Sequence, residues 1–213
     1  MLNTVYRLVA PRTFEPVVVS QDTAGKVVVR PTHLSICNAD QRYYQGTRDR
    51  AVLDRKLPMA LIHEGIGRVV SDGTGTFRPG DRVVMLPNAP VEQDEFIAEN
   101  YLRTSRFCGS GFDGFMQEAM VLPPERVVLL PSGIDPEVAA FTELVSVATH
   151  AISRFDEIAH GRRSRIGVWG DGNMGYIVSL LLHVRYPDAQ IVVFGRNESK
   201  LHDFTFADET HLV

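Results

Sequence analysis

The sequence predicts an α/β protein with two domains, a mostly-β domain over residues 1–150 and the beginning of a doubly wound domain over residues 151–213. Two observations support this class. Up to about residue 135, short β-type segments are separated by glycine- and proline-rich turns. Beyond that point apolar residues recur at helical spacing, and a short apolar strand then runs into a glycine-rich turn.

The first domain is expected to be barrel-like, because its β-type segments are short and closely spaced. Valine-rich runs bounded by turn residues indicate strands at residues 26–31, 67–70, 82–86 and 119–122. A helix start follows at Asp135, with proline and an acid in the next two positions. Apolar residues at helical spacing continue this helix: Phe141, Leu144, Val145, Ala148, Ile152 and Phe155.

Composition excludes several classes of protein. The chain has 213 residues, a net charge of -4 and 44% hydrophobic residues, which is typical of a globular protein and not of one that binds nucleic acid or an anionic membrane. No apolar stretch is long enough to span a bilayer, and the first residues lack the pattern of a signal peptide. Two cysteines, Cys37 and Cys108, make no disulfide framework, so we expect a reducing cytoplasm.

A βαβ unit opens the second domain. Residues 165–169 and 191–194 are predicted strands, and residues 176–182 are a predicted helix. The turn after the first strand, Gly170-Asp171-Gly172-Asn173-Met174-Gly175, matches the dinucleotide fingerprint G-x-G-x-x-G. In that fingerprint the first glycine permits a tight turn, the second a close approach of the pyrophosphate, and the third close packing of helix on strand. The alternative is a strand-turn-helix corner that uses glycine for geometry alone.

The end of the second predicted strand indicates which dinucleotide is bound. NAD sites have an acid there for the ribose 2′-hydroxyl, whereas this chain has Arg196, with Lys200 one turn later. A guanidinium suits a 2′-phosphate, so we expect NADPH. The alternative is that Arg196 is a solvated loop residue and Glu198 takes the place of the acid.

Four side chains have the chemistry of a zinc site, namely Cys37, His63, Glu64 and Glu143. A catalytic zinc ion takes about three protein ligands, drawn from thiolate, imidazole and carboxylate groups, and keeps one position open. Sequence separation alone does not show that the four converge. Cys37 could equally be a small buried residue, and His63 could be a core histidine. Glu143 lies on an apolar helix, where a buried carboxylate needs a partner.

These segments resemble the zinc-dependent medium-chain dehydrogenases. The resemblance rests on residues 35–40, 62–69, 79–83, 113–118, 142–144 and 170–175, which stand in the order of that family. It implies a GroES-like catalytic domain followed by a Rossmann domain. It also implies one catalytic zinc ion held by Cys37, His63 and a carboxylate from Glu64 or Glu143, with both carboxylates competing for the metal.

A closer resemblance is to the ribulose-5-phosphate reductases, through residues 5–12, 40–44, 56–59, 98–102 and 166–173. It implies zinc- and NADPH-dependent reduction of D-ribulose 5-phosphate to D-ribitol 5-phosphate, for CDP-ribitol and for teichoic acid or capsule synthesis. Expected partners are the sugar phosphate and either a second copy of the chain or a cytidylyltransferase. The alternatives are another zinc-dependent polyol or sugar dehydrogenase, and a truncated remnant that binds zinc or a partner without turnover.

Three departures from the family pattern matter. Ala39 stands where the family usually has Ser or Thr, so a proton must reach the product by another route. The stretch 88–109 contains only Cys108, so we expect no structural zinc. A doubly wound domain has two βαβαβ halves, and the chain ends at Val213, so we expect a truncated second domain without much of the nicotinamide half of its cofactor site.

The phosphate of the substrate needs cationic contacts. Arg42, shortly after Cys37, is the best-placed residue by sequence, with Arg48 and Lys56 behind it. The alternative is that residues 42–56 are a solvated basic segment, balanced by its own acids.

Overall fold

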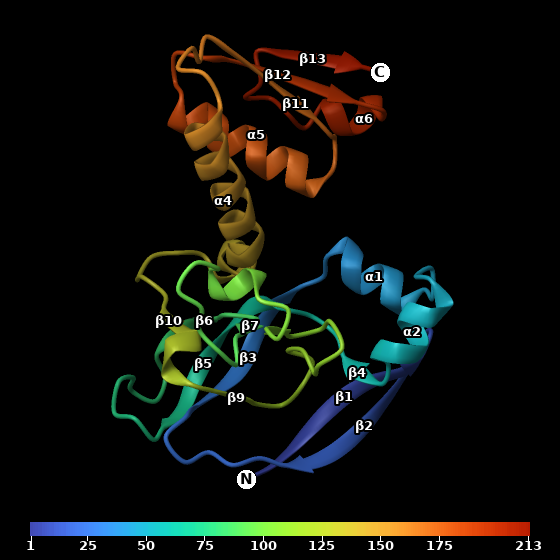
Figure 1. Ribbon diagram of the computed structural model, residues 1–213, viewed down its shortest axis with the longest axis vertical. Helices are drawn as coiled ribbons and strands as arrows, with labels where there is room; N and C mark the ends of the chain where they lie inside the picture. Colours follow the sequence, from blue (N-terminus) through green and yellow to red (C-terminus); the bar gives the residue numbers. More distant parts are fainter. The chain divides into compact units, whose positions relative to one another are not determined.

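The computed structural model describes residues Met1–Val213 and divides into two compact units, Met1–Glu143 and Leu144–Val213 (Figure 1). The division falls inside helix α4, Thr142–Ile158. The first unit is mostly β and the second is a small parallel sheet with helices, which confirms the predicted α/β class.

An antiparallel sheet of five strands dominates the first unit. Its order is β10 (Val127–Leu129), β6 (Arg82–Met85), β5 (Glu64–Asp72), β3 (Val27–Ser35) and β9 (Met120–Leu122). The four strands predicted in this region are confirmed as β3, β5, β6 and β9. Inward-facing residues such as Val29, Val83 and Phe115 are fully buried beneath the sheet and form the main core.

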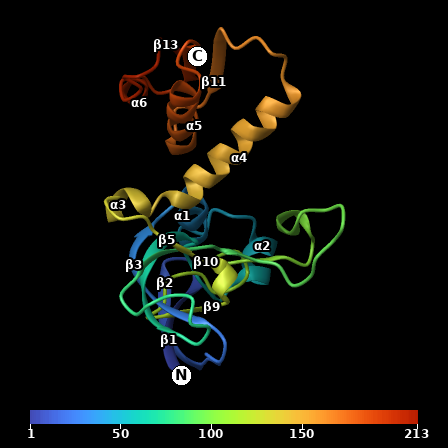
Figure 2. The same ribbon diagram turned by 90° about the vertical axis from the view of Figure 1, so that its left-hand side faces the viewer.

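Smaller β elements complete the first unit, and the sequence analysis did not predict them. Strands β2 (Thr13–Ser20), β1 (Leu2–Ala10) and β4 (Met59–Ala60) form a second sheet, in which β1 and β2 make a hairpin (Figure 2). Arg12 lies in the turn of that hairpin and has a left-handed backbone conformation, with a φ of 65°. A further hairpin joins β7 (Asn88–Ala89) to β8 (Arg106–Phe107), and two 3-10 turns, η1 (Glu99–Tyr101) and η2 (Pro124–Arg126), lie in the loops.

The pairing of β3 with β5 positions the candidate ligands. Its last paired residues are Ser35 and Glu64. Cys37 follows Ser35 by two residues and His63 directly precedes Glu64, so both leave the sheet at the same end. Helices α1 (Asn38–Tyr44) and α2 (Arg50–Lys56) then fill the connection from β3 to β4.

The helix predicted from Asp135 onward is two helices, which corrects that prediction. Asp135 caps α3 (Pro136–Ala139) by accepting a hydrogen bond from the N–H of Glu137 at 2.7 Å. Two turn residues follow α3, and the Thr142 hydroxyl donates across them to the carbonyl of Ala139 at 2.6 Å. Helix α4 starts again at Thr142, and this second start places Glu143 in its first turn.

The second unit contains the predicted βαβ arrangement. Strands β11 (Arg165–Trp169), β12 (Gln190–Gly195) and β13 (Glu209–Leu212) are parallel and adjacent in that order, with α5 (Asn173–Arg185) packed along them (Figure 1). Helix α5 begins at Asn173, within the glycine motif and earlier than predicted. Strand β13 and the short helix α6 (Glu198–Leu201) were not predicted.

Candidate metal centre and nucleotide loop

Cys37 is held at the start of α1. Its side chain is the N-cap of the helix and accepts a hydrogen bond from the N–H of Ala39 at 3.3 Å. Its Sγ also lies 3.7 Å from Nε2 of His63. Burial raises the pKa of the Cys37 thiol to about 12 in the metal-free chain. A bound cation would reverse that shift, because metal ligation favours the thiolate.

His63 and Glu64 form the opposite side of the cluster. The side chain of His63 is 12% exposed and that of Glu64 is fully buried, with His63 Nε2 3.6 Å from Glu64 Oε1. The edge of the imidazole ring rests on Phe107, at a centroid distance of 5.2 Å. Ile62, directly before His63, has a φ of 70° that few non-glycine residues adopt, so the approach to His63 is a constrained turn.

Glu143 completes this group from the first turn of α4. One ligand atom from each of His63, Glu64 and Glu143 lies within 4.8 Å of the others. Burial, together with the negative charges of Glu64 and Asp40, raises the pKa of Glu143 to about 7. The structure therefore places all four sequence-predicted zinc ligands around one imidazole, with Cys37 Sγ 3.7 Å from His63 Nε2 and the two glutamates grouped with the same ring. We call Cys37, His63, Glu64 and Glu143 the metal cluster.

The metal cluster fits a cation. Both carboxylate oxygens of Glu64 are buried and have no hydrogen-bond partner. Buried carboxylates normally have such partners, because an unpaired one is costly. A second group of possible ligand atoms, from Cys37, Asp40 and His63, shares the imidazole with the first. Thiolate, imidazole and carboxylate together match the preferences of zinc.

Asp40 links the segments that carry two of the candidate ligands, and it was not among the residues predicted from the sequence. Its Oδ1 accepts from the N–H of Ile62 at 2.9 Å, and its Oδ2 accepts from the N–H and the thiol of Cys37 at 3.1 and 3.2 Å. It is 2% exposed. One carboxylate therefore ties together the two segments that carry Cys37 and His63. The available signal was a capping box, in which the third residue after a helix N-cap is acidic.

The three basic residues considered for the substrate phosphate have different surroundings. Arg42 is exposed in the last turn of α1. Arg48 lies over the ring of Tyr43 at 4.4 Å. Lys56 donates to the hydroxyl of Ser110 at 2.6 Å.

The glycine loop, residues 170–175, has backbone geometry that requires glycine at two positions. Gly170 has a φ of 142°, which side chains rarely permit. A Cβ on Gly175 would lie 2.0 Å from the carbonyl oxygen of Gly170. Gly172 is the N-cap of α5 and has open space around it, with no side chain capping the helix. The first N–H groups of this 13-residue helix, which include those of Asn173 and Met174, are thus uncapped, as a phosphate site requires.

The turn after β12, residues 195–197, carries Arg196, and we call it the arginine turn. Arg196 and Lys200 are both exposed. The backbone N–H groups of Arg196 and Asn197 each donate to Oδ2 of Asp171 at 2.7 Å. This contact of Asp171 was not predicted from the sequence, although the residue lies between two glycines of the motif.

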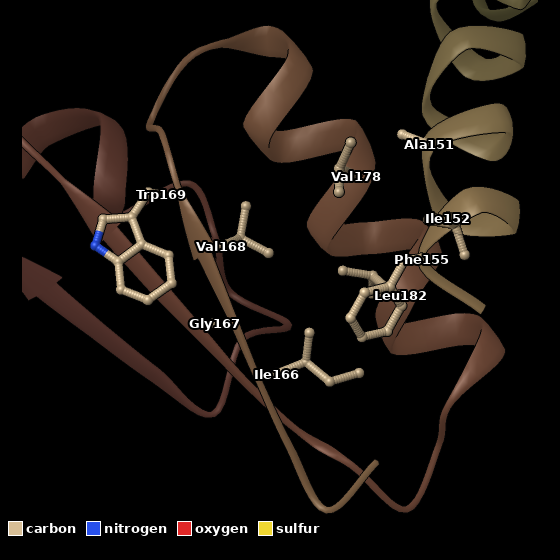
Figure 3. A pocket seen from close by; sticks show the side chains of 9 residues that line it. All are labelled: Ala151, Ile152, Phe155, Ile166, Gly167, Val168, Trp169, Val178 and Leu182. Atoms are coloured by element: carbon tan, nitrogen blue, oxygen red, sulfur yellow. The ribbon is translucent and has the colours of Figure 1, made fainter. Parts of the chain in front are cut away.

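An apolar cavity of about 270 Å³ lies within the second unit (Figure 3). Side chains from α4, β11 and α5 line it, including Phe155, Val168 and Leu182. It has no charged lining residue, so it suits neither a phosphate nor a metal ion.

No helix of the chain combines the length and apolar character needed to cross a bilayer.

Comparison with known proteins identifies similar chains. Residues 23–132 match the family model of the alcohol dehydrogenase GroES-like domain. The chain is 58% identical over 216 residues to a ribulose-5-phosphate reductase of Bacillus spizizenii, and 50% identical over 214 residues to ribulose-5-phosphate reductase 1 of Staphylococcus aureus. Both alignments cover 100% of this chain and 63% of the relative, so the chain spans less than two thirds of their length.

A solved structure shows the same arrangement of elements. The crystal structure of S. aureus TarJ in complex with NADPH superposes with a TM-score of 0.82 at 43% identity, covering 100% of this chain and 60% of that one.

Proposed function

Because the chain belongs to the medium-chain dehydrogenase family, through its alcohol dehydrogenase GroES-like domain, we propose that it serves the zinc- and NADPH-dependent reduction of D-ribulose 5-phosphate to D-ribitol 5-phosphate. The product would enter CDP-ribitol and teichoic acid or capsule synthesis. The observation that carries the proposal is the metal cluster, in which the buried Glu64 carboxylate has no hydrogen-bond partner and lies 3.6 Å from the His63 ring. The names of two relatives that match over the whole chain support the substrate.

The metal cluster is proposed to hold one zinc ion through Cys37, His63 and a carboxylate from Glu64 or Glu143. A bound zinc ion would supply a Lewis acid for the C2 carbonyl of the ketose phosphate. The protein's part is to keep the donors convergent. Asp40 does this for Cys37 and for the turn before His63.

The cofactor is proposed to bind the glycine loop and the arginine turn. The uncapped start of α5 suits the pyrophosphate, and Gly172 leaves room for its approach. Arg196 and Lys200 are proposed to bind the ribose 2′-phosphate, in keeping with the NADPH found in the TarJ structure. Glu198, the alternative ligand for a ribose hydroxyl, is the first residue of α6.

Among the basic residues, Lys56 has the strongest support as a ligand of the substrate phosphate. Its partner Ser110 directly follows Gly109, and a Cβ on Gly109 would lie 3.4 Å from Nδ1 of His63. Lys56 is therefore bonded to a residue whose neighbour in the chain lies beside the His63 ring. Arg42 and Arg48 remain weaker proposals, because neither has a described contact of this kind.

The direct test loads the purified chain with zinc and follows the loss of NADPH absorbance with ribulose 5-phosphate. We expect turnover with ribulose 5-phosphate and NADPH, and much less with free ribulose or with NADH. Turnover on free ketoses instead would select a different polyol or sugar dehydrogenase. Zinc binding without any turnover would overturn the reductase proposal for this chain and favour a role in binding alone. Sedimentation with and without a cytidylyltransferase would test the two proposed protein partners, a second copy and that enzyme.

A further inference from the structure

The glycine loop and the arginine turn are joined by a single carboxylate. Asp171 Oδ2 accepts from the N–H groups of both Arg196 and Asn197, each at 2.7 Å. The contact is close, since a Cβ on Gly195 would meet Cβ of Asp171 at 2.7 Å. The backbone adds a second link, because Gly170 N–H donates to the carbonyl of Phe194 at 2.8 Å.

These bonds occupy the donors that the turn would otherwise present to a ligand. Two neighbouring N–H groups that converge on one oxygen form a small anion-binding concavity, which Asp171 fills. The Asn197 side chain in turn accepts from the N–H of Lys200 at 3.3 Å and caps α6. Hydrogen bonds from Asn197 and Arg196 keep the pKa of Asp171 below its ordinary value, so the carboxylate is ionised at neutral pH.

A 2′-phosphate arriving at this turn therefore finds the backbone donors already used. Its recognition is left to side chains, of which Arg196 is the cationic one carried by the turn, since Asn197 caps α6. Binding through an exposed arginine costs affinity because the long side chain becomes ordered, and a mobile backbone would add the cost of ordering the loop. Fixing the backbone N–H of Arg196 fixes the direction in which its side chain leaves the chain.

We propose that Asp171 is a positioning residue for recognition of the ribose 2′-phosphate, acting through the arginine turn and not through contact with the phosphate. The inference rests on the proposed use of NADPH. The negative charge of Asp171 opposes a phosphate, but this repulsion is screened at an exposed site. Lys200 lowers it further, being close enough to favour the ionised form of Asp171.

The test uses two halves of the cofactor, 2′,5′-ADP and 5′-AMP, which differ in the 2′-phosphate. Isothermal titration of the whole chain should show that the wild type prefers 2′,5′-ADP. For Asp171→Ala we expect about a tenfold loss of affinity for 2′,5′-ADP and less than about a twofold change for 5′-AMP. Asp171→Asn keeps one acceptor oxygen, so its affinity for 2′,5′-ADP should lie between those of the wild type and Asp171→Ala. Asp188→Ala, which removes an exposed acid from the turn before β12, is the matched control and should change neither.

The possible outcomes separate the inference from its premise. A wild-type chain without preference for 2′,5′-ADP would overturn the NADPH assignment, and this inference with it. A wild-type preference that survives Asp171→Ala, or an equal loss for both ligands, would overturn the positioning role alone. Tighter binding of 2′,5′-ADP by Asp171→Asn would overturn it too, because repulsion would then be the larger effect. Thermal denaturation of each variant shows whether the second unit remains folded.

Discussion

The metal cluster and the glycine loop differ in the groups that they leave without a hydrogen bond, which are acceptors in the first and donors in the second. The metal cluster gathers side chains from the N-terminus of α1, the start of β5 and α4, and it buries the two Glu64 carboxylate oxygens without a hydrogen bond to either. The glycine loop is one continuous segment that leaves the N–H groups of a helix start uncapped. An excess of buried acceptors selects a cation, and free donors select an anion. The comparison teaches that what a site leaves unpaired indicates what it binds.

The largest expected effect is the loss of zinc affinity when one ligand of the metal cluster is removed. Serine is a good N-cap, so Cys37→Ser should keep α1 while removing the soft ligand. We expect zinc affinity to fall by about 1000-fold, beyond the roughly 10–100-fold that outer partners of a zinc site cost. Competition with a chelator measures the affinity. Cys108→Ser is the control and should retain zinc; retention by Cys37→Ser would remove Cys37 from the ligand set.

A smaller effect is expected from Asp40→Ala, which removes the link between the Cys37 and His63 segments. Zinc affinity should fall by about 10–100-fold, as for other residues that orient metal ligands. Asp49→Ala is a matched control, because Asp49 caps α2 by accepting from Ala51 N–H at 2.8 Å. Asp49→Ala should lose about 1 kcal/mol of stability, and Asp40→Ala about 1–3 kcal/mol, because it leaves the buried N–H of Ile62 without an acceptor. Equal zinc affinities in the two would show that Asp40 only caps its helix.

Two substitutions in the glycine loop separate its contribution to stability from its contribution to nucleotide binding. Gly175→Ala places a Cβ against the Gly170 carbonyl and should destabilise the second unit by about 1–3 kcal/mol, even without nucleotide. Gly172→Ala meets open space, so it should leave stability nearly unchanged and weaken 5′-AMP binding instead. Denaturant unfolding and calorimetry measure the two effects. Unchanged 5′-AMP affinity in Gly172→Ala would mean that the loop has no close contact with phosphate.

Lys56→Ala tests whether Lys56, near the metal cluster, binds the phosphate of the substrate. Losing one charge-assisted contact to a phosphate should raise KM for ribulose 5-phosphate about tenfold. The KM for NADPH should hardly change. Arg42→Ala is the control, as it removes a similar charge from α1. A larger effect from Arg42→Ala would reassign the phosphate contact to that residue.

The smallest effect concerns the charge balance of the metal-free cluster. Because the folded-state pKa of Glu143 is about 7 and its ordinary value is 4.5, the folded chain holds a proton that the unfolded chain releases. Stability therefore falls as pH rises from about 4.5 to about 7 and stays low above that. Glu143→Gln should raise the melting temperature above pH 7 by roughly 2–4 °C, which corresponds to about 1 kcal/mol. The melting curves are recorded with chelator, and no gain is expected near pH 4. A gain that is equal at both pH values would show that charge is not its cause.

Sequence patterns predicted the second unit better than the first. The βαβ unit and its glycine loop depend on neighbours in the chain, and β11, α5 and β12 occur in the predicted order, with α5 starting earlier, at Asn173. The strands β1 and β2 were missed although they form a local hairpin, because the left-handed position of its turn is taken by Arg12 and not by the glycine or asparagine that usually marks such a turn. The break between α3 and α4 was missed because Phe141, which lies in it, fits the helical spacing of the apolar residues that follow.

By itself the sequence determined the fold class, the order of the domains, the glycine loop and the identity of the four zinc-type side chains. Those depend on residue chemistry and on spacings of a few residues. Only the tertiary structure decided that Cys37, His63, Glu64 and Glu143 meet, and that Asp40 and Asp171 each bind two backbone segments. Contacts of this kind depend on strand register and on the direction of each side chain. A one-residue shift between β3 and β5 would reverse those directions, so the convergence follows from packing and not from the sequence pattern.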